Sequence, residues 1–179
     1  MQCTGVLVKS DDGGAGHMAH GRNMDIGLDV GNLTAQVTWM HGNQPVMTTT
    51  QFVGYTGVHT GMRLGGWTVQ ANERIVLTPG PEIGWEKASL LLTLGALAEG
   101  HLTIGLYLRD ALLGAASYDD ALPVLASTKL ASPMYIIVGG VRAGEGAVIT
   151  RDRAGIATEV SSDSDFRTVE YTTCSRAKA

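Results

Sequence analysis

The spacing of apolar residues changes twice along this chain, and the change limits the folds that it can adopt. Apolar residues nearly alternate with polar ones over 33–53, recur at helical spacing over 84–115, and form strand-like runs again after Pro133. An order of strands, helices and strands is typical of a layered α+β domain. With 179 residues the chain is long enough to bury a core. We therefore predict a single domain over residues 1–179.

Short strands and turns are predicted in the first part of the chain. The run 3–9 ends at the turn-forming residues SDDGG and a second run follows at 18–25, so we expect the two to pair as antiparallel strands. A hairpin is predicted over 33–53 and a further strand over 67–74. The glycine-punctuated stretch between them, 54–66, is expected to be a loop.

Helices are predicted in the middle of the chain and strands in its last part. Helical spacing covers 84–100 and 102–115, and this helical region is expected to pack on one face of the sheet. A third helix is expected to begin at Ser117, because Ser117 and Asp120 resemble a capping box with aspartate in place of glutamate. The later strands are predicted at 134–140, 146–152, 156–162 and 166–171.

The composition argues against several classes of partner. The net charge is −4 and no Lys/Arg cluster stands out, so nucleic acid is not expected as a partner. The longest apolar stretch, 89–108, is interrupted by Glu99, His101 and three glycines, which favours buried helices over a membrane span. The sequence does not begin with a basic segment followed by an apolar one, so we expect no signal peptide in this chain.

Cys3, Arg22 and Asp25 form the first candidate constellation. A thiol is a useful nucleophile as the thiolate, which a nearby guanidinium favours. Asp25 would hold a positive group, such as the α-amine of a strand-leading residue. However, a spacing of three places Arg22 and Asp25 on opposite faces of a strand, so they converge only where the backbone bends. Spacing alone therefore favours a buried cysteine beside a surface Arg–Asp pair.

Glu73 is the second candidate, at the end of the strand predicted at 67–74. Asn72 and Glu73 would contact a substrate there, or Glu73 would pair with an arginine as scaffold. A strand-end charge is usually solvated, so the local pattern favours the second interpretation. The five histidines show no ligand spacing, and neither a metal nor a cofactor is expected.

Six short motifs follow one another along the chain: CTGVLV…HGRNMD, FVGYTGVHTG, NER, SYDDAL, SPMYIIVGG and GEGAVITRDR. In this order, from Cys3 to about Arg153, they resemble the acid ceramidase and N-acylethanolamine acid amidase family of lysosomal N-terminal nucleophile hydrolases. The resemblance implies an αββα sandwich, incomplete here at the C-terminus and corresponding to the family's catalytic β-subunit. It also implies hydrolysis of fatty-acyl amides, ceramide or N-acylethanolamine, to a fatty acid and an amine.

The resemblance assigns roles to the candidate residues. A precursor cleaves itself immediately before the cysteine, so that Cys3 supplies both a thiol nucleophile and an α-amine base, and a thioester forms on Cys3. Arg22 would position or polarise the site, and Asp25 would orient the α-amine. Glu73 would support autocleavage or orientation.

The chain departs from the family pattern at both ends. Met1 and Gln2 precede Cys3, so cleavage before Cys3 has to occur for this mechanism to run. The family has a Thr-Asn-Tyr-Asp motif whose asparagine helps to form the oxyanion hole, whereas 171–173 here read Tyr-Thr-Thr. Loss of one such donor typically costs ~10²–10³ in turnover.

The resemblance also implies partners and a location. A lipid amide substrate, a separate subunit derived from the pro-segment, and a membrane surface or lipid-presenting protein are the expected partners, in a lysosomal or secreted setting. Two alternatives stay open. One is an amidase like bile-salt hydrolase or penicillin V acylase, which also begin near a cysteine and use GRN.D. The other is an inactive remnant that binds lipid or a partner, with Cys3 as a core residue.

Overall fold

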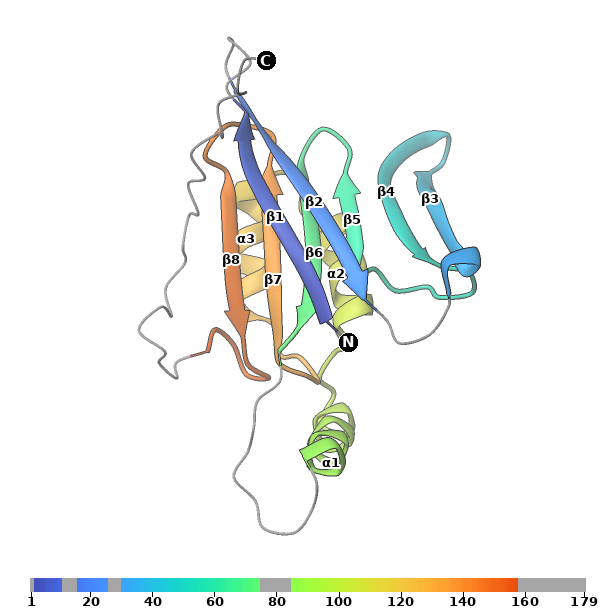
Figure 1. The fold of residues 1–179 in the computed structure, drawn as a ribbon, viewed down its shortest axis with the longest axis vertical. Helices are drawn as coiled ribbons and strands as arrows, with labels where there is room; N and C mark the ends of the chain where they lie inside the picture. The colour runs from blue at the N-terminus through green and yellow to red at the C-terminus, as the bar shows by residue number, and fades with distance from the viewer. Residues whose placement is uncertain (1, 11–15, 26–29, 75–84, 158–179) are drawn as a thin grey trace, which may run out of the picture.

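The structure is a computed structural model (Figure 1), and it describes four stretches of the chain. These stretches are residues 2–10, 16–25, 30–74 and 85–157. Within them the chain forms one two-stranded sheet, one six-stranded sheet and three α-helices, which confirms the predicted α+β class. The strand predicted at 166–171, most of that at 156–162, and the Tyr-Thr-Thr segment lie outside the described residues.

The two-stranded sheet holds the first candidate residues. β1 (Gln2–Ser10) pairs antiparallel with β2 (His17–Asp25), as predicted, and Cys3 lies opposite Met24. Burial alternates along β2, because successive side chains of a strand point to opposite faces. The inward-facing set consists of Met18, His20, Arg22 and Met24.

The six-stranded sheet is antiparallel throughout, and its strands lie in chain order. They are β3 (Thr34–His41), β4 (Gln44–Phe52), β5 (Thr60–Arg63), β6 (Trp67–Glu73), β7 (Met134–Gly140) and β8 (Gly146–Arg151). A short 3₁₀ turn, η1 (Gly31–Leu33), leads into β3. The prediction of a loop over 54–66 was wrong for β5. All four of its residues pair with β6 and the last three also pair with β4, and this tertiary pairing overrides the low strand propensity of their glycine-rich surroundings.

The three helices begin and end close to the predicted ranges. They are α1 (Trp85–Ala98), α2 (Ile104–Gly114) and α3 (Tyr118–Ser127). The capping box of α3 is confirmed: the amide of Asp120 donates to Ser117 Oγ at 3.2 Å, and the amide of Ser117 donates to Asp120 Oδ2 at 3.2 Å. This pair satisfies two backbone donors that would otherwise lack partners in the first helical turn.

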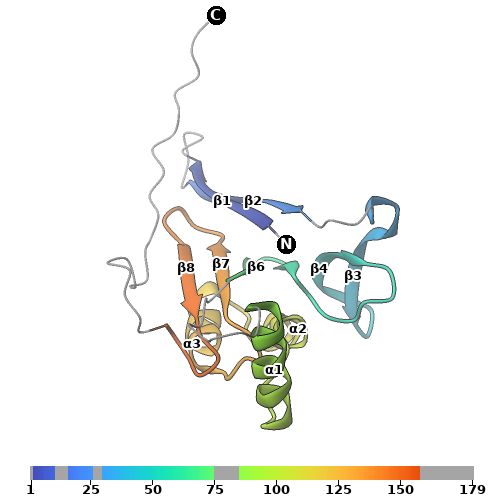
Figure 2. The same cartoon turned by 60° about the horizontal axis from the view of Figure 1, so that its bottom comes forward.

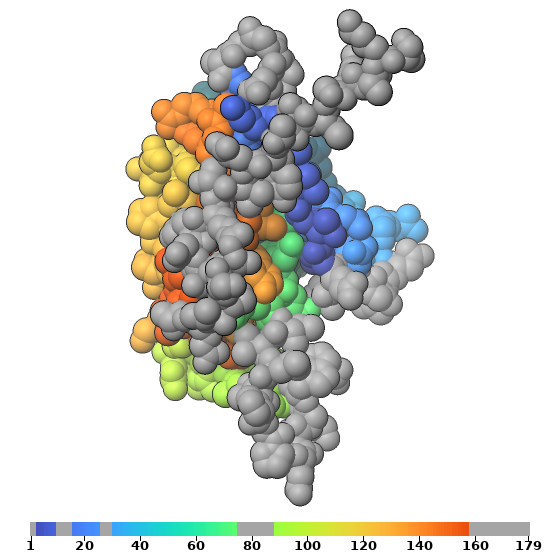
Figure 3. Space-filling model, turned by 60° about the vertical axis from the view of Figure 1, so that its left-hand side comes forward, coloured from blue at the N-terminus to red at the C-terminus, as the bar shows by residue number. Residues whose placement is uncertain are grey.

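The described elements form three layers. Helices α2 and α3 lie on one face of the six-stranded sheet, and β1 and β2 lie on the other (Figure 2). The space-filling view shows α3 and the blue strands on opposite sides of the molecule (Figure 3). The main hydrophobic core fills the space between this sheet and α2 and α3. Its fully buried members include Met47, Trp67, Leu108, Leu112, Leu125, Ile136 and Ile149.

Gly5 allows the two sheets to approach closely. It lies opposite Arg22 in the register of β1 and β2. A Cβ at Gly5 would lie 2.2 Å from Nε2 of Gln70 and 2.5 Å from Cδ1 of Ile137. A larger residue at this point would force the ends of the Gln70 and Ile137 side chains to move.

Helix α1 differs from α2 and α3 in its surroundings. It lies at one end of the molecule, past the ends of the strands (Figure 1). The prediction that the helical region packs on the sheet therefore applies to α2 and α3. Five leucines of α1 are exposed: Leu90, Leu91, Leu92, Leu94 and Leu97. Among the described residues, none of the helices has the length and apolar character needed to cross a membrane.

Candidate active site

The structure brings Cys3 and Arg22 together. Both side chains lie on the inward face of the two-stranded sheet, and Cys3 is half-buried. Arg22 Nη2 donates to the sulfur of Cys3 at 3.5 Å. The antiparallel register makes this contact diagonal, since Cys3 lies opposite Met24 and not opposite Arg22.

The guanidinium of Arg22 is fixed by backbone and side-chain acceptors. Its Nη1 donates to the His59 carbonyl at 2.6 Å and to the Thr60 hydroxyl, and its Nη2 donates to the Ala71 carbonyl at 2.7 Å. Its Nε is buried and has no hydrogen-bond partner among the described residues. Burial lowers the pKa of Arg22 and the hydrogen bond to Cys3 opposes that shift, but an arginine remains charged in either case.

Asn72 lies at the same centre. Its Nδ2 donates to the carbonyl oxygen of Cys3 at 3.3 Å, and Gln70 Nε2 donates to Asn72 Oδ1 at 3.0 Å. Asn72 was predicted as a substrate contact, whereas Gln70 and His20 were not predicted to lie at the site. A usable signal existed: Gln70 and Asn72 are two apart, as are His20 and Arg22, so each pair shares one face of its strand.

Asp25 and Glu73 are not brought to the Cys3–Arg22 pair. Asp25 is exposed on the outward face of β2, and its Oδ1 accepts a hydrogen bond from Asn23 Nδ2 at 2.9 Å. In the register it lies opposite Gln2, next to the position of Cys3. Glu73 is exposed at the end of β6. The roles given to these two carboxylates stay predictions.

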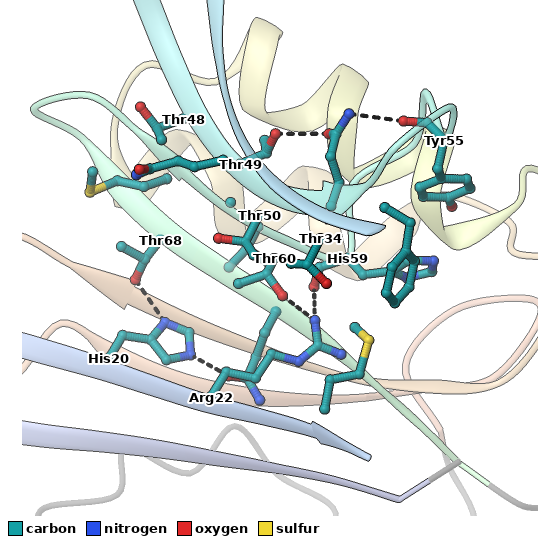
Figure 4. Close-up of a pocket in the computed structure, with 18 of the residues that line it drawn as sticks. His20, Arg22, Thr34, Thr48, Thr49, Thr50, Tyr55, His59, Thr60 and Thr68 are labelled. Carbon is teal, nitrogen blue, oxygen red and sulfur yellow. Dashed lines mark hydrogen bonds between the residues drawn. The ribbon is translucent and has the colours of Figure 1, made fainter. Parts of the chain in front are cut away.

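A cavity of about 610 Å³ opens beside Arg22, a volume in the usual range for small-molecule sites. It lies between β2, the β3–β4 hairpin and β5, and Figure 4 shows its lining. Hydroxyl groups dominate the polar part of this lining, and Met24, Phe52, Met62 and Val69 contribute apolar surface. The hydroxyl groups belong to Thr34, Thr48, Thr49, Thr50, Thr60, Thr68 and Tyr55.

Two histidines line the cavity. His20 Nδ1 is 2.8 Å from the Thr68 hydroxyl, and His20 Nε2 is 3.0 Å from Gln70 Oε1. The His59 ring stacks on Tyr55, with centroids 5.1 Å apart. Burial lowers the pKa of both histidines, and the positive charge of Arg22 lowers each further. No group of His, Cys, Asp and Glu in the described part of the chain could hold a metal ion.

Comparisons with known proteins show what this chain is similar to. No protein-family model matches the sequence. The N-acylethanolamine-hydrolyzing acid amidase of Mus musculus is 36% identical over 157 residues, covering 87% of this chain and 40% of that protein. The acid ceramidase of Homo sapiens is 32% identical over 166 residues, covering 84% and 40%. The chain thus spans about 40% of the length of the curated relatives that it matches.

A solved structure gives the same result for the fold. The Caenorhabditis elegans N-acylethanolamine-hydrolyzing acid amidase ortholog matches with a TM-score of 0.70 and 28% identity, covering 86% of this chain and 61% of that one. The resemblance inferred from the six motifs is thereby confirmed. Over most of its own length, this chain is a relative, in sequence and in fold, of N-acylethanolamine-hydrolyzing acid amidase and acid ceramidase.

Proposed function

We propose that this chain is the nucleophile-bearing part of a cysteine amidase that hydrolyses fatty-acyl amides to a fatty acid and an amine. One observation carries the proposal: Arg22, which lines the cavity and is anchored by three other acceptors, lies against the sulfur of Cys3. An anchored guanidinium at this distance can orient the sulfur and stabilise negative charge that develops during its attack on a carbonyl. The names of the relatives, an N-acylethanolamine-hydrolyzing amidase and a ceramidase, support the substrate class.

The proposed reaction begins with cleavage of the peptide bond before Cys3, which frees its α-amine. The sulfur then attacks the amide carbonyl while the α-amine takes the thiol proton and passes it to the leaving amine. Water attacks the resulting thioester, with the same amine as base, and releases the fatty acid and Cys3. Asp25 would orient the α-amine, and its place opposite Gln2 in the register supports that role. Glu73 would support autocleavage.

The lining of the cavity combines hydroxyl groups with apolar surface from Met24, Phe52, Met62 and Val69. Such a lining accepts a hydrocarbon segment together with a polar group. We propose that the lipid amide enters this cavity with its scissile amide next to Arg22.

The exposed leucines of α1 support a lipid-facing role. We propose that this helix contacts a membrane surface or a lipid-presenting protein, where a lipid amide would be met, in a lysosomal or secreted setting. A separate subunit derived from a pro-segment is the other proposed partner. Full activity on a soluble substrate without detergent, together with no binding to liposomes, would count against the lipid-facing role of α1.

The deciding experiment measures fatty-acid release from a ceramide and a set of N-acylethanolamines, at acidic and neutral pH, for the full chain and for Cys3→Ala. A glycine-conjugated bile salt and penicillin V are included for the alternative amidases. We expect the wild-type chain to release fatty acid from a lipid amide and Cys3→Ala to release none. We also expect the intact mass of the wild-type protein to lack Met1 and Gln2. Release from neither protein would leave the inactive lipid-binding remnant as the better reading.

A further inference from the structure

A row of side-chain hydrogen bonds connects the cavity to the backbone of Cys3. It starts at His20, whose Nε2 is 3.0 Å from Gln70 Oε1. Gln70 Nε2 donates to Asn72 Oδ1 at 3.0 Å, and Asn72 Nδ2 donates to the Cys3 carbonyl at 3.3 Å. Figure 4 shows Thr68 on the other side of the His20 ring.

The chemistry of the groups gives this row a direction. Only the nitrogen of an amide donates, and that of Gln70 is used on Asn72, so its oxygen faces His20. Nε2 of His20 must therefore carry a proton. The Nδ1 of His20 lies 2.8 Å from the Thr68 hydroxyl, and that hydroxyl donates to the Gly139 carbonyl at 3.1 Å. Burial lowers the pKa of the His20 ring.

The row crosses between two sheets that no backbone ladder joins. β1 pairs with β2 alone, whereas Gln70 and Asn72 belong to the six-stranded sheet. Both amide side chains are buried, and hydrogen bonds are stronger and more costly to leave unmade in such surroundings. The Asn72 bond therefore holds the peptide plane that follows Cys3 against β6.

We propose that His20 is a positioning residue for Cys3: through Gln70 and Asn72 it orients the peptide plane after Cys3 and so directs the sulfur toward Arg22. His20 does not touch the sulfur or the reacting atoms. The proposal rests on the proposed function for its meaning in turnover, but the orientation of the thiol can be measured without any substrate.

The test is the alkylation rate of Cys3 by iodoacetamide at pH 7.0, followed by peptide mass, in a Cys174→Ser background. We expect His20→Leu to lower this rate about tenfold, as for a small displacement of a reacting group. His20→Gln, which again offers a nitrogen donor at the position of Nε2, should restore most of it. His17→Leu is the matched control on the exposed face of the same strand, and we expect its alkylation rate at Cys3 to equal that of the wild type.

Two results would overturn the proposal. One is an unchanged rate in folded His20→Leu, and the other is a rate for His20→Gln as low as that of His20→Leu. If His20→Leu does not fold, Thr68→Val decides, because valine fits the same space and removes only the hydroxyl that orients the ring. There a rate lower by about fivefold supports the proposal, and the wild-type rate overturns it.

Failure of the proposed function is distinguishable from failure of this inference. A chain that releases no fatty acid but shows the expected order of alkylation rates would refute the amidase and support the positioning role. If the chain is an amidase and kcat is unchanged in both His20→Leu and His20→Gln, the proposed function is supported and the positioning role of His20 is refuted. In an active enzyme we expect kcat to fall in His20→Leu and to recover in His20→Gln.

Discussion

Arg22 Nη2 lies 3.5 Å from the sulfur of Cys3, and the same nitrogen donates to the Ala71 carbonyl at 2.7 Å. One guanidinium nitrogen thus joins the nucleophile candidate to β6, while the other holds the backbone at His59 and the hydroxyl of Thr60. The planar fork of arginine makes these contacts possible at once. The charge beside Cys3 is therefore fixed in place before any substrate arrives.

Arg22→Lys should slow the alkylation of Cys3 at pH 7.0 by about tenfold. Lysine carries the same charge, but its single ammonium cannot replace the contacts on both guanidinium nitrogens, and so it does not hold the charge against the sulfur. The measurement is the rate with iodoacetamide, with Cys174 replaced by serine. Arg142→Lys is the matched control, because Arg142 is exposed and pairs with Glu145 and Asp119. An unchanged rate in folded Arg22→Lys would mean that the anchoring of the charge by both guanidinium nitrogens does not govern the reactivity of Cys3.

Stability should fall as the pH is lowered, because of His20 and His59. Burial and the charge of Arg22 lower the pKa of both histidines in the folded protein. In the unfolded chain their pKa returns to about 6.5. As the pH falls through that value, the unfolded state binds protons that the folded state does not, so the free energy of unfolding decreases.

This pH effect is measured by urea unfolding between pH 7.5 and 5.0. We expect a smaller loss of unfolding free energy in the double variant His20→Gln/His59→Gln than in the wild type, because glutamine does not titrate. Equal losses in the two proteins would show that these histidines do not cause the pH dependence.

The elements of the fold could be predicted wherever local signals agree with tertiary pairing. The strand pair at 3–9 and 18–25, the hairpin over 33–53 and the capping box at Ser117 have local signals, and each element was predicted correctly, whereas the turn residues 11–14 lie outside the described residues. β5 could not be predicted. Its four residues become a strand through pairing with β4 and β6, and no periodicity shows in a segment so short.

The site was harder to predict than the fold, because register decides which residue faces inward. In the sequence, Asn72 and Glu73 are adjacent and either could face the nucleophile. The register of β6 sends Asn72 toward Cys3 and leaves Glu73 exposed. The sequence of β6 alternates apolar Trp67, Val69 and Ala71 with polar Thr68, Gln70 and Asn72, which places Asn72 and Glu73 on opposite faces. Which of these faces meets the nucleophile is decided by the packing of β1 and β2 on the sheet, and the sequence of β6 alone does not contain it. The Cys3–Arg22 contact likewise follows from the pairing of β1 with β2.

Asp25→Asn should separate the chemistry of the α-amine from that of the thiol. Asp25 is exposed and lies on the face opposite Arg22, so we expect the fold and the alkylation rate of Cys3 to be unchanged. If Asp25 orients the α-amine, fatty-acid release should fall by about 10²-fold, in the range of a lost acid–base contribution. Asp119→Asn, an exposed carboxylate on α3, is the control. Wild-type release from Asp25→Asn would remove Asp25 from the mechanism.

Arg151→Met should destabilise the protein without altering Cys3. Arg151 is fully buried, and it donates to the carbonyls of Leu125, Thr128 and Gly155. Two of these carbonyls lie at the C-terminal end of α3, where helical carbonyls lack partners within the helix.

Methionine fills similar space but leaves these buried acceptors unsatisfied, so we expect the free energy of unfolding to fall by about 3 kcal/mol. Urea unfolding at pH 7.5 gives this value, and Arg142→Met, on the surface, should change it far less. The alkylation rate of Cys3 in folded Arg151→Met should equal that of the wild type. Arg151 holds α3 against β8, and the hydrogen-bond acceptors named above do not belong to β1 or β2. A loss of stability no larger than that of Arg142→Met would show that water replaces the guanidinium at no cost, and that Arg151 does not anchor the helix.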